Sequence, residues 1–185
     1  MEGDLREGVR YLKLESPKDK WVLWTGGAIN HHDPSVSEHL LRYVGAGLKG
    51  DESLLLGVDL RDDMEALHSF LSHEAVGEQE HGLIAYLNQE LNLGLAPGGF
   101  RFQVKVEETI CRLVLQLVAE EPMDFGSLGA SLKAGDAIDT GYVYVYEKAT
   151  VKSVIQKAGL SLVGEWIDRS QDYGLFLLRR ATGQP

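Results

Sequence analysis

Residues 21–63 constrain the fold most strongly, because they predict a strand, a helix and a second strand in succession. The two apolar runs are WVLWT and SLLLGVD, and each leads into polar residues. The segment between them, DPSVSEHLLRYVGAGL, has apolar residues at helical spacing, and Asp33 or a Ser35–Glu38 capping box can start the helix. Parallel strands joined in this way deliver their carboxyl ends to one binding crevice, so we predict a β-α-β unit.

The remaining residues predict two helices, an antiparallel β region, and a closing helix followed by two strands. Helices are expected at residues 64–71 and 83–91, with a polar turn at residues 77–82. Strands are expected at residues 100–107, 110–119, 142–146, 160–167 and 173–179. We therefore predict an α/β protein in which residues 1–20 are a lead-in, residues 21–63 and 149–181 form the core, and residues 64–148 form an inserted helical and β lobe for substrate.

Composition and charge exclude several classes of function. The chain has 28 acidic and 18 basic residues and a net charge of -10, which disfavours nucleic acid and anionic membranes as partners. Cys111 is the only cysteine, so an internal disulfide is impossible. No apolar run approaches the roughly 20 residues needed to span a bilayer, and the N-terminus lacks the apolar core of a signal peptide. We expect a cytoplasmic protein with a small-molecule substrate.

Four residues are candidates for substrate binding: Asn30, Asp59, Tyr142 and Tyr144. Asn30 follows the first predicted strand and Asp59 ends the second, so both should lie at the crevice. An asparagine amide can hold a carboxylate and an amine, or it can cap a turn, and Asp59 can serve as an acid or base or cap a helix. Tyr142 and Tyr144 belong to an alternating stripe with Tyr146, which packs or lines a pocket. The histidines near residue 31 do not predict a metal site, and no catalytic residue is assigned.

Several segments, quoted in order, resemble one enzyme family. They are GGAIN, DESLLLGVDLRDD, YLNQEL, GDAIDT and KAGLSLVGEWIDRSQDYGLFLLRR. Over residues 11–181 the chain resembles the C-terminal half of the histidine-specific S-adenosylmethionine (SAM)-dependent methyltransferases, which include ergothioneine-pathway histidine N-methyltransferases and fungal dimethylallyltryptophan N-methyltransferases. The resemblance implies a partial Rossmann-like methyltransferase sheet, containing only the late strands, with an inserted antiparallel β lobe. It also places Asn30 at the position of a substrate-contacting asparagine.

Other substrate positions of that family are changed in this chain. The family's substrate tyrosine falls near Ser69, Phe70 or Leu71, and the glutamate and serine that hold imidazole fall near Gly141 and Val143. None of these residues supplies the corresponding phenol, carboxylate or hydroxyl group. We hypothesise that an apolar or indole-like substrate suits these replacements better than histidine.

The cofactor-binding half of the family has no counterpart in the sequence. Residues 45–50, GAGLKG, spell GxGxxG, but they follow a predicted helix and precede a strand, which is the reverse of the order in a cofactor turn. We therefore expect a truncated methyltransferase-like protein of amino-acid or alkaloid metabolism that binds SAM only when a partner completes it. Two alternatives stay open: a cofactor-independent cyclase or isomerase built on the half-fold, and a non-catalytic partner subunit.

The strand predicted to begin at Trp21 would be paired on both sides in a complete methyltransferase sheet. With no preceding strands, it should expose an apolar, unpaired edge. We expect a second copy in a homodimer, a separate partner chain, or residues 5–14 to cover this edge.

Overall fold

The computed structural model describes residues 20–91, 93–125 and 128–181. The chain forms two compact units, each with its own sheet. Unit 1 lies within residues 1–62 and 144–185, and unit 2 is formed by residues 63–143. The segment at residues 5–14, which the sequence offers as a cover for the first strand, lies outside the described residues.

Unit 1 contains a mixed four-stranded sheet. Its strands are β1 (Trp21–Trp24), β2 (Ser53–Asp59), β9 (Tyr173–Arg180) and β8 (Leu160–Ile167), in that order across the sheet. β1 and β2 are parallel and are connected through η1 (Ala28–His31) and α2 (Pro34–Gly45), which confirms the predicted β-α-β unit. β9 is antiparallel to both β2 and β8. Both parallel strands therefore end at the same edge of the sheet.

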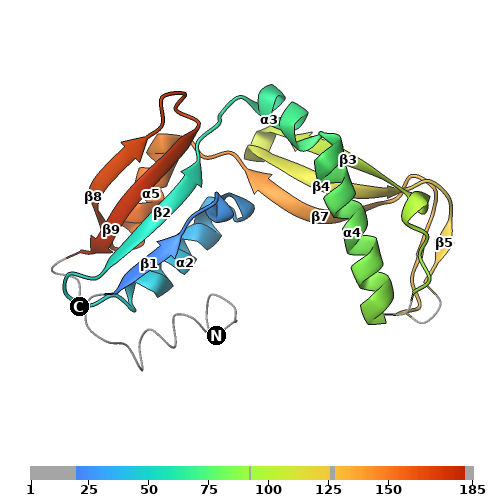
Figure 1. Cartoon of the computed structure of the whole chain (residues 1–185), viewed down its shortest axis with the longest axis horizontal. Helices are drawn as coiled ribbons and strands as arrows, with labels where there is room; N and C mark the ends of the chain where they lie inside the picture. Colours follow the sequence, from blue (N-terminus) through green and yellow to red (C-terminus); the bar gives the residue numbers. More distant parts are fainter. Residues whose placement is uncertain (1–19, 92, 126–127, 182–185) are drawn as a thin grey trace. The chain divides into compact units, whose positions relative to one another are not determined.

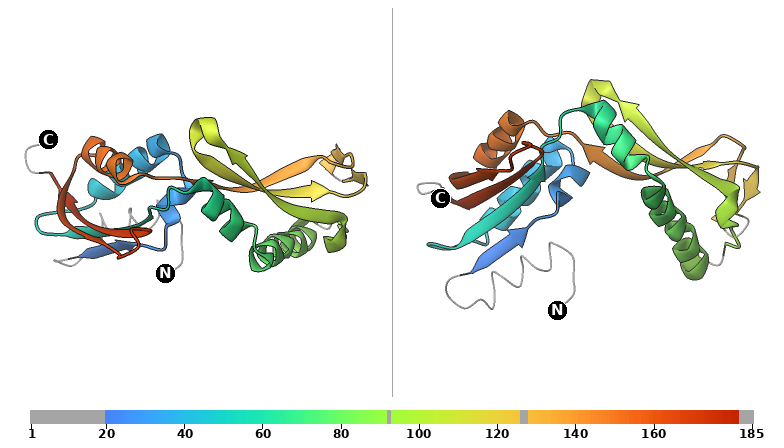
Figure 2. Two further views of the ribbon diagram at one scale, coloured as in Figure 1. Left: turned by 90° about the horizontal axis from the view of Figure 1, so that it is seen from above. Right: turned by 45° about the horizontal axis from the view of Figure 1, so that its top comes forward.

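Two helices cover one face of this sheet. α2 and α5 (Lys148–Lys157) contact each other, and they lie on the same side of the strands in Figure 1 and Figure 2. Alternate side chains of β2 and β9 point toward the helices, because successive residues of a strand face opposite sides. The core residues on these four elements are Leu54, Leu56, Val58, Phe176, Leu178, Leu41, Val44, Val151, Val154 and Ile155.

The start of α2 is fixed by Asp33. Its carboxylate accepts hydrogen bonds from the backbone N–H of Ser35 (2.7 Å) and Val36 (3.1 Å), and Pro34 occupies the first helical position. The Ser35 hydroxyl and these N–H groups stabilise the charged carboxylate and lower its pKa. The alternative Ser35–Glu38 capping box is wrong, because Asp33 takes the cap position and Glu38 instead pairs with Arg42 one turn later.

The other face of the sheet, which we call the open face, is also apolar. Leu23 is paired with Leu55, Leu55 with Leu177, and Leu175 with Trp166, so their side chains share this face. Trp21 is 62% exposed, Leu23 67% and Trp166 55%. Among the described residues of unit 1 no helix lies on the open face, and β1 has only β2 as a neighbour in the sheet.

Unit 2 combines a three-stranded sheet with two helices. The sheet order is β3 (Phe100–Glu107), β4 (Arg112–Ala119) and β7 (Ala137–Tyr144), and β3 and β4 form an antiparallel hairpin through η3 (Glu108–Ile110). A short ribbon pairs β5 (Met123–Asp124) with β6 (Ser131–Leu132), and η2 (Pro97–Gly99) precedes β3. α3 (Met64–Leu71) and α4 (Glu74–Leu91) both contact β3. The core includes Ile84, Phe100, Leu117 and Phe125.

Three boundaries in this region differ from the sequence prediction. The turn predicted at residues 77–82 is wrong, because α4 continues through both of its glycines; an interior glycine costs a helix only about 1 kcal/mol. β4 begins at Arg112 rather than residue 110, since Cys111 adopts a left-handed conformation with φ of 48°. β7 ends at Tyr144, and Tyr146 is completely buried in the core of unit 1.

No helix within the described ranges is long and apolar enough to cross a bilayer.

Candidate functional site

The carboxyl ends of β1 and β2 form the candidate site. After β1 the chain enters a turn at Gly26 and Gly27, whose φ angles of 76° and 70° lie in the left-handed region that glycine adopts readily. The turn leads into η1, which carries Asn30, while β2 ends at Asp59. The two predicted substrate residues of the β-α-β unit are therefore neighbours at one edge of the sheet.

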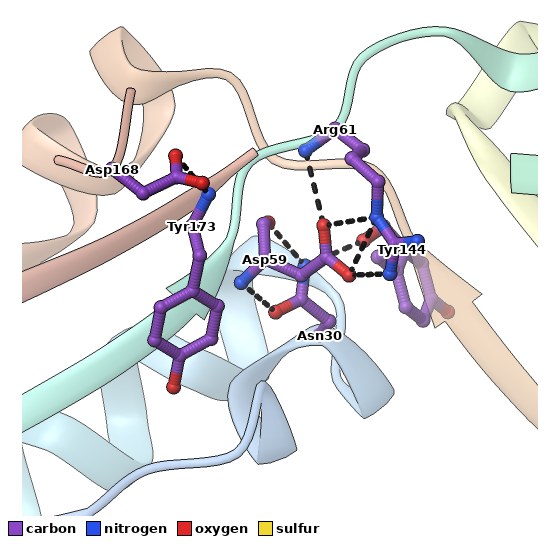
Figure 3. A network of polar contacts seen from close by, with 6 residues as sticks. All are labelled: Asn30, Asp59, Arg61, Tyr144, Asp168 and Tyr173. Atoms are coloured by element: carbon purple, nitrogen blue, oxygen red, sulfur yellow. Dashed lines mark hydrogen bonds and ion pairs between the residues drawn. The ribbon is translucent and has the colours of Figure 1, made fainter. Parts of the chain in front are cut away.

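Asn30 ties three segments together through its side-chain amide. Its Nδ2 donates to the backbone oxygens of Asp59 (2.8 Å) and Tyr144 (3.1 Å), and its Oδ1 accepts from the backbone N–H of Asp59 (3.0 Å). Figure 3 shows this amide beside the Asp59 backbone. Asn30 is only 5% exposed, and both of its amide protons are donated to backbone oxygens. The residue therefore fixes the shape of the site through contacts with the backbone.

Asp59 forms a close ion pair with Arg61. The carboxylate accepts hydrogen bonds from Arg61 Nε at 3.0 and 3.1 Å, from Arg61 Nη2, and from the Arg61 backbone N–H at 3.1 Å. The hydrogen bonds that the Arg61 side chain donates to Asp59 are the main cause of a raised pKa for Arg61. Both carboxylate oxygens of Asp59 are therefore engaged by one guanidinium, which fixes the position of this side chain at the end of β2.

The predicted tyrosine stripe is divided between the two units. In unit 1 the backbone oxygen of Tyr144 accepts from Asn30, and the Tyr146 hydroxyl lies 2.9 Å from the His32 oxygen and 2.7 Å from Ser37 Oγ. In unit 2 the Tyr142 hydroxyl donates to Asp139 (3.1 Å), and the Arg112 guanidinium lies 4.5 Å from the centre of the Tyr142 ring. The structure therefore brings Asn30, Asp59 and Tyr144 together in unit 1, and it places Tyr142 in unit 2.

Asp63, one of the acidic residues that follow β2, fixes the start of α3. Its carboxylate accepts from the backbone N–H of Glu65 and Ala66, both at 3.0 Å, and so caps α3.

Sequence reasoning missed three residues of this edge: Arg61, Gly57 and Tyr173. The Tyr173 hydroxyl accepts a hydrogen bond from the Gly26 backbone N–H at 2.9 Å. Gly57 was the one sequence signal of this contact, because a glycine inside a strand often marks the close approach of another group. Nothing in the sequence connects that glycine to Tyr173, which lies on β9.

The described residues offer no metal-binding cluster at this edge. In the part of the chain that the structure describes, no group of three or more His, Cys, Asp or Glu side chains could hold a metal ion. His39 Nδ1 lies 2.7 Å from the Ser35 oxygen within α2. Burial is the main cause of a lowered pKa for His32.

Comparison with known protein families identifies the family of this chain. The family model described as histidine-specific methyltransferase, SAM-dependent, matches residues 1–180. The chain belongs to the histidine-specific, SAM-dependent methyltransferase family. No curated protein sequence matches this methyltransferase-family chain.

Solved structures resemble this methyltransferase-family chain in fold. The PH0226 protein from Pyrococcus horikoshii OT3 has 16% identity and a TM-score of 0.50, covering 96% of this chain and 60% of its own. A SAM-dependent methyltransferase from Clostridium acetobutylicum ATCC 824 has 7% identity, a TM-score of 0.47, and coverage of 92% and 62%. The CcbJ methyltransferase from Streptomyces caelestis has 13% identity, a TM-score of 0.43, and coverage of 97% and 62%. The chain thus spans about three fifths of these structures.

The acidic group and the glycine turn at the strand ends, which are the kinds of group that hold the nucleoside of SAM, the cofactor that the family uses, both contact protein atoms. An acidic side chain can bind ribose hydroxyls, and both carboxylate oxygens of Asp59 accept hydrogen bonds from Arg61. A Cβ atom placed on Gly27 would lie 3.6 Å from Asn30 Oδ1 and 3.6 Å from Asp59 Cβ, so the glycine turn already packs against protein.

Proposed function

We propose that unit 1 forms the methyl-acceptor side of a SAM-dependent N-methyltransferase acting on a small amine of amino-acid or alkaloid type. The observation that carries this proposal is the convergence of β1 and β2 on the Asn30 amide, at the carboxyl ends of two parallel strands. Ligands of open α/β sheets bind at such strand ends. The family supplies the reaction class.

In this proposal SAM is held by polypeptide outside the described residues. The pairing of Asp59 with Arg61 and the close packing at Gly27 support this view, because neither leaves a ribose contact at the strand ends. The chain contributes a shaped edge for the acceptor, in which Asn30 holds the β1 turn against β2.

The acceptor is proposed to be indole-like rather than imidazole-like. By the family resemblance, the positions that hold imidazole fall near Gly141 and Val143. A Cβ atom added at Gly141 would lie 3.5 Å from Leu115 Cδ1, so this position faces an apolar side chain. An imidazole would find no carboxylate at either residue, and buried polar groups without partners bind poorly.

Thermal melting with added ligand tests this substrate class. We expect L-tryptophan to raise the melting temperature and L-histidine to leave it unchanged. At ten times its dissociation constant a ligand adds about 1.4 kcal/mol, which is about 3–6 °C for a chain of this size. A shift with L-histidine alone, or with neither compound, would contradict the proposal.

We also propose that the open face is covered by the polypeptide that carries the cofactor side of the fold. The comparison with the Pyrococcus horikoshii structure supports this choice of occupant. Two fifths of that structure lies outside the match, whereas 96% of this chain lies within it. The four residues of β1 are all apolar and include no charge or proline to protect the edge. A homodimer through the same face is the competing outcome.

Replacing Leu23 by serine tests the role of the open face. Without its cover the chain should self-associate and bind an apolar dye, and Leu23→Ser should lower both signals because it removes exposed apolar area. Light scattering after size exclusion and dye fluorescence measure the two effects. Leu91→Ser is the matched control, since Leu91 is 44% exposed on α4 of unit 2. The proposal would be contradicted if the two variants had equal effects, or if the parent chain were a monomer that binds no dye. A discrete dimer that Leu23→Ser dissociates would favour the homodimer.

A further inference from the structure

The side chain of Tyr173 reaches across a whole strand. Tyr173 lies on β9, where it is paired with Asp59 of β2. Its hydroxyl nevertheless accepts a hydrogen bond of 2.9 Å from Gly26, which follows β1 on the far side of β2. One phenol ring therefore connects β9 to the end of β1.

Gly57 on β2 provides the space for this ring. A Cβ atom at Gly57 would lie 2.1 Å from the Tyr173 hydroxyl oxygen, 3.0 Å from Tyr173 Cζ and 3.1 Å from Thr25 Cα. Contacts below 3.0 Å cannot be accommodated without movement, so any larger residue would displace the phenol. The strand is therefore built to let the ring lie across it, in keeping with glycine at sites of close approach.

The base of Tyr173 is itself anchored. The Tyr173 backbone N–H donates to Asp168 Oδ1 at 3.1 Å, and Ser170 Oγ donates to Asp168 Oδ2 at 2.5 Å. Figure 3 shows the Asp168 contact and the direction of the Tyr173 ring. The turn between β8 and β9 thus fixes the backbone of Tyr173, from which the side chain extends toward Gly26.

The turn that receives this hydroxyl has two attachments. At its far end, Asn30 Oδ1 accepts from the Asp59 backbone N–H at 3.0 Å. At its near end, Gly26 donates to Tyr173. Gly26 and the following Gly27 both have φ angles in the left-handed region, and glycine is the residue with the greatest backbone freedom. Removing the Tyr173 hydroxyl would leave the near end of the turn free to move.

We propose that Tyr173 is a positioning residue for the acceptor, acting through the Gly26–Gly27 turn. This inference rests on the proposed function, in which the acceptor binds at the turn. Holding the turn in one conformation before binding reduces the ordering that binding requires and so raises affinity. Gly26 is exposed, so water can replace the lost hydrogen bond and the fold should tolerate the loss.

Amide hydrogen exchange in the isotope-labelled chain tests the contact directly. In Tyr173→Phe the Gly26 amide should exchange about fivefold to tenfold faster than in the parent chain, as expected for the loss of one ordinary hydrogen bond. Tyr86→Phe is the matched control, because Tyr86 is 58% exposed in unit 2. Gly57→Ala should speed Gly26 exchange by displacing the ring, and adding Tyr173→Phe to it should have no further effect.

Affinity for L-tryptophan separates positioning from a purely structural role. The dissociation constant should rise about threefold to tenfold in Tyr173→Phe, while the melting temperature stays within about 2 °C of the parent chain. Unchanged Gly26 exchange would overturn the proposal, and so would faster exchange with unchanged affinity. If the parent chain binds neither L-tryptophan nor L-histidine, the proposed function and the acceptor role of Tyr173 both fail, while Gly26 exchange still decides whether Tyr173 orders the turn.

Discussion

Replacing Asn30 by alanine is expected to destabilise unit 1 by about 2–4 kcal/mol, because three backbone groups lose their partners in a region with little access to water. These groups are the N–H and the oxygen of Asp59 and the oxygen of Tyr144. All three tryptophans, Trp21, Trp24 and Trp166, lie in unit 1, so tryptophan fluorescence during urea unfolding reports this unit alone.

Two further variants define what the Asn30 result means. Asn30→Asp keeps an acceptor oxygen but loses both donated protons and places a negative charge beside two backbone oxygens, so it should be at least as destabilising as alanine. Gln89→Ala removes an exposed amide from α4 of unit 2 and should leave the fluorescence transition unchanged. A normal transition for Asn30→Ala would show that the amide serves the ligand rather than the fold.

Tyr146→Phe is expected to cost unit 1 about 1–3 kcal/mol at neutral pH. The Tyr146 side chain is fully buried, and its hydroxyl is the partner of both the His32 oxygen and the buried Ser37 hydroxyl. The phenylalanine ring fills the same space, so the loss reflects the polar contacts rather than a cavity. Urea unfolding followed by tryptophan fluorescence measures it, with Tyr86→Phe as the exposed control.

The same tyrosine predicts a difference at high pH. Burial is the main cause that raises the pKa of Tyr146 to about 12, from 10.0. The folded state therefore keeps a proton that the unfolded state releases, so this contribution is complete below pH 10.0 and is lost as the pH rises toward about 12. Over that range it amounts to at most about 3 kcal/mol. The stability of Tyr146→Phe should fall less steeply with pH than that of the parent chain, and parallel curves would contradict this assignment.

Much of the fold could be predicted because local signals agreed with the final packing. The apolar run at residues 53–59, the alternation at residues 100–107 and the cap at Asp33 each coincide with an element of the structure. The errors arose where a weak local signal was overruled. Gly77 and Gly82 suggested a turn, yet α4 continues through them, and Tyr146 matched a strand pattern but is buried beside α2 through Ser37.

The site was less predictable than the fold, because its contacts join residues far apart in the sequence. Asn30 and Asp59 could be placed at one edge from the β-α-β pattern, but the pattern does not show that the Asn30 amide is used by the backbone of Asp59 and Tyr144. The contact of Tyr173 with Gly26 requires the antiparallel placement of β9 beside β2, and no local pattern specifies that order.

Calorimetric titration of the chain with SAM tests most directly whether this protein is the acceptor side of a methyltransferase completed by other polypeptide. We expect no measurable heat of SAM binding for the chain alone, whereas L-tryptophan should bind. Saturable binding of SAM to the isolated chain would contradict the proposal that other polypeptide holds the cofactor. Failure of the chain to bind any small amine would instead favour a non-catalytic subunit, and turnover of an amine substrate without SAM would favour a cofactor-free cyclase or isomerase.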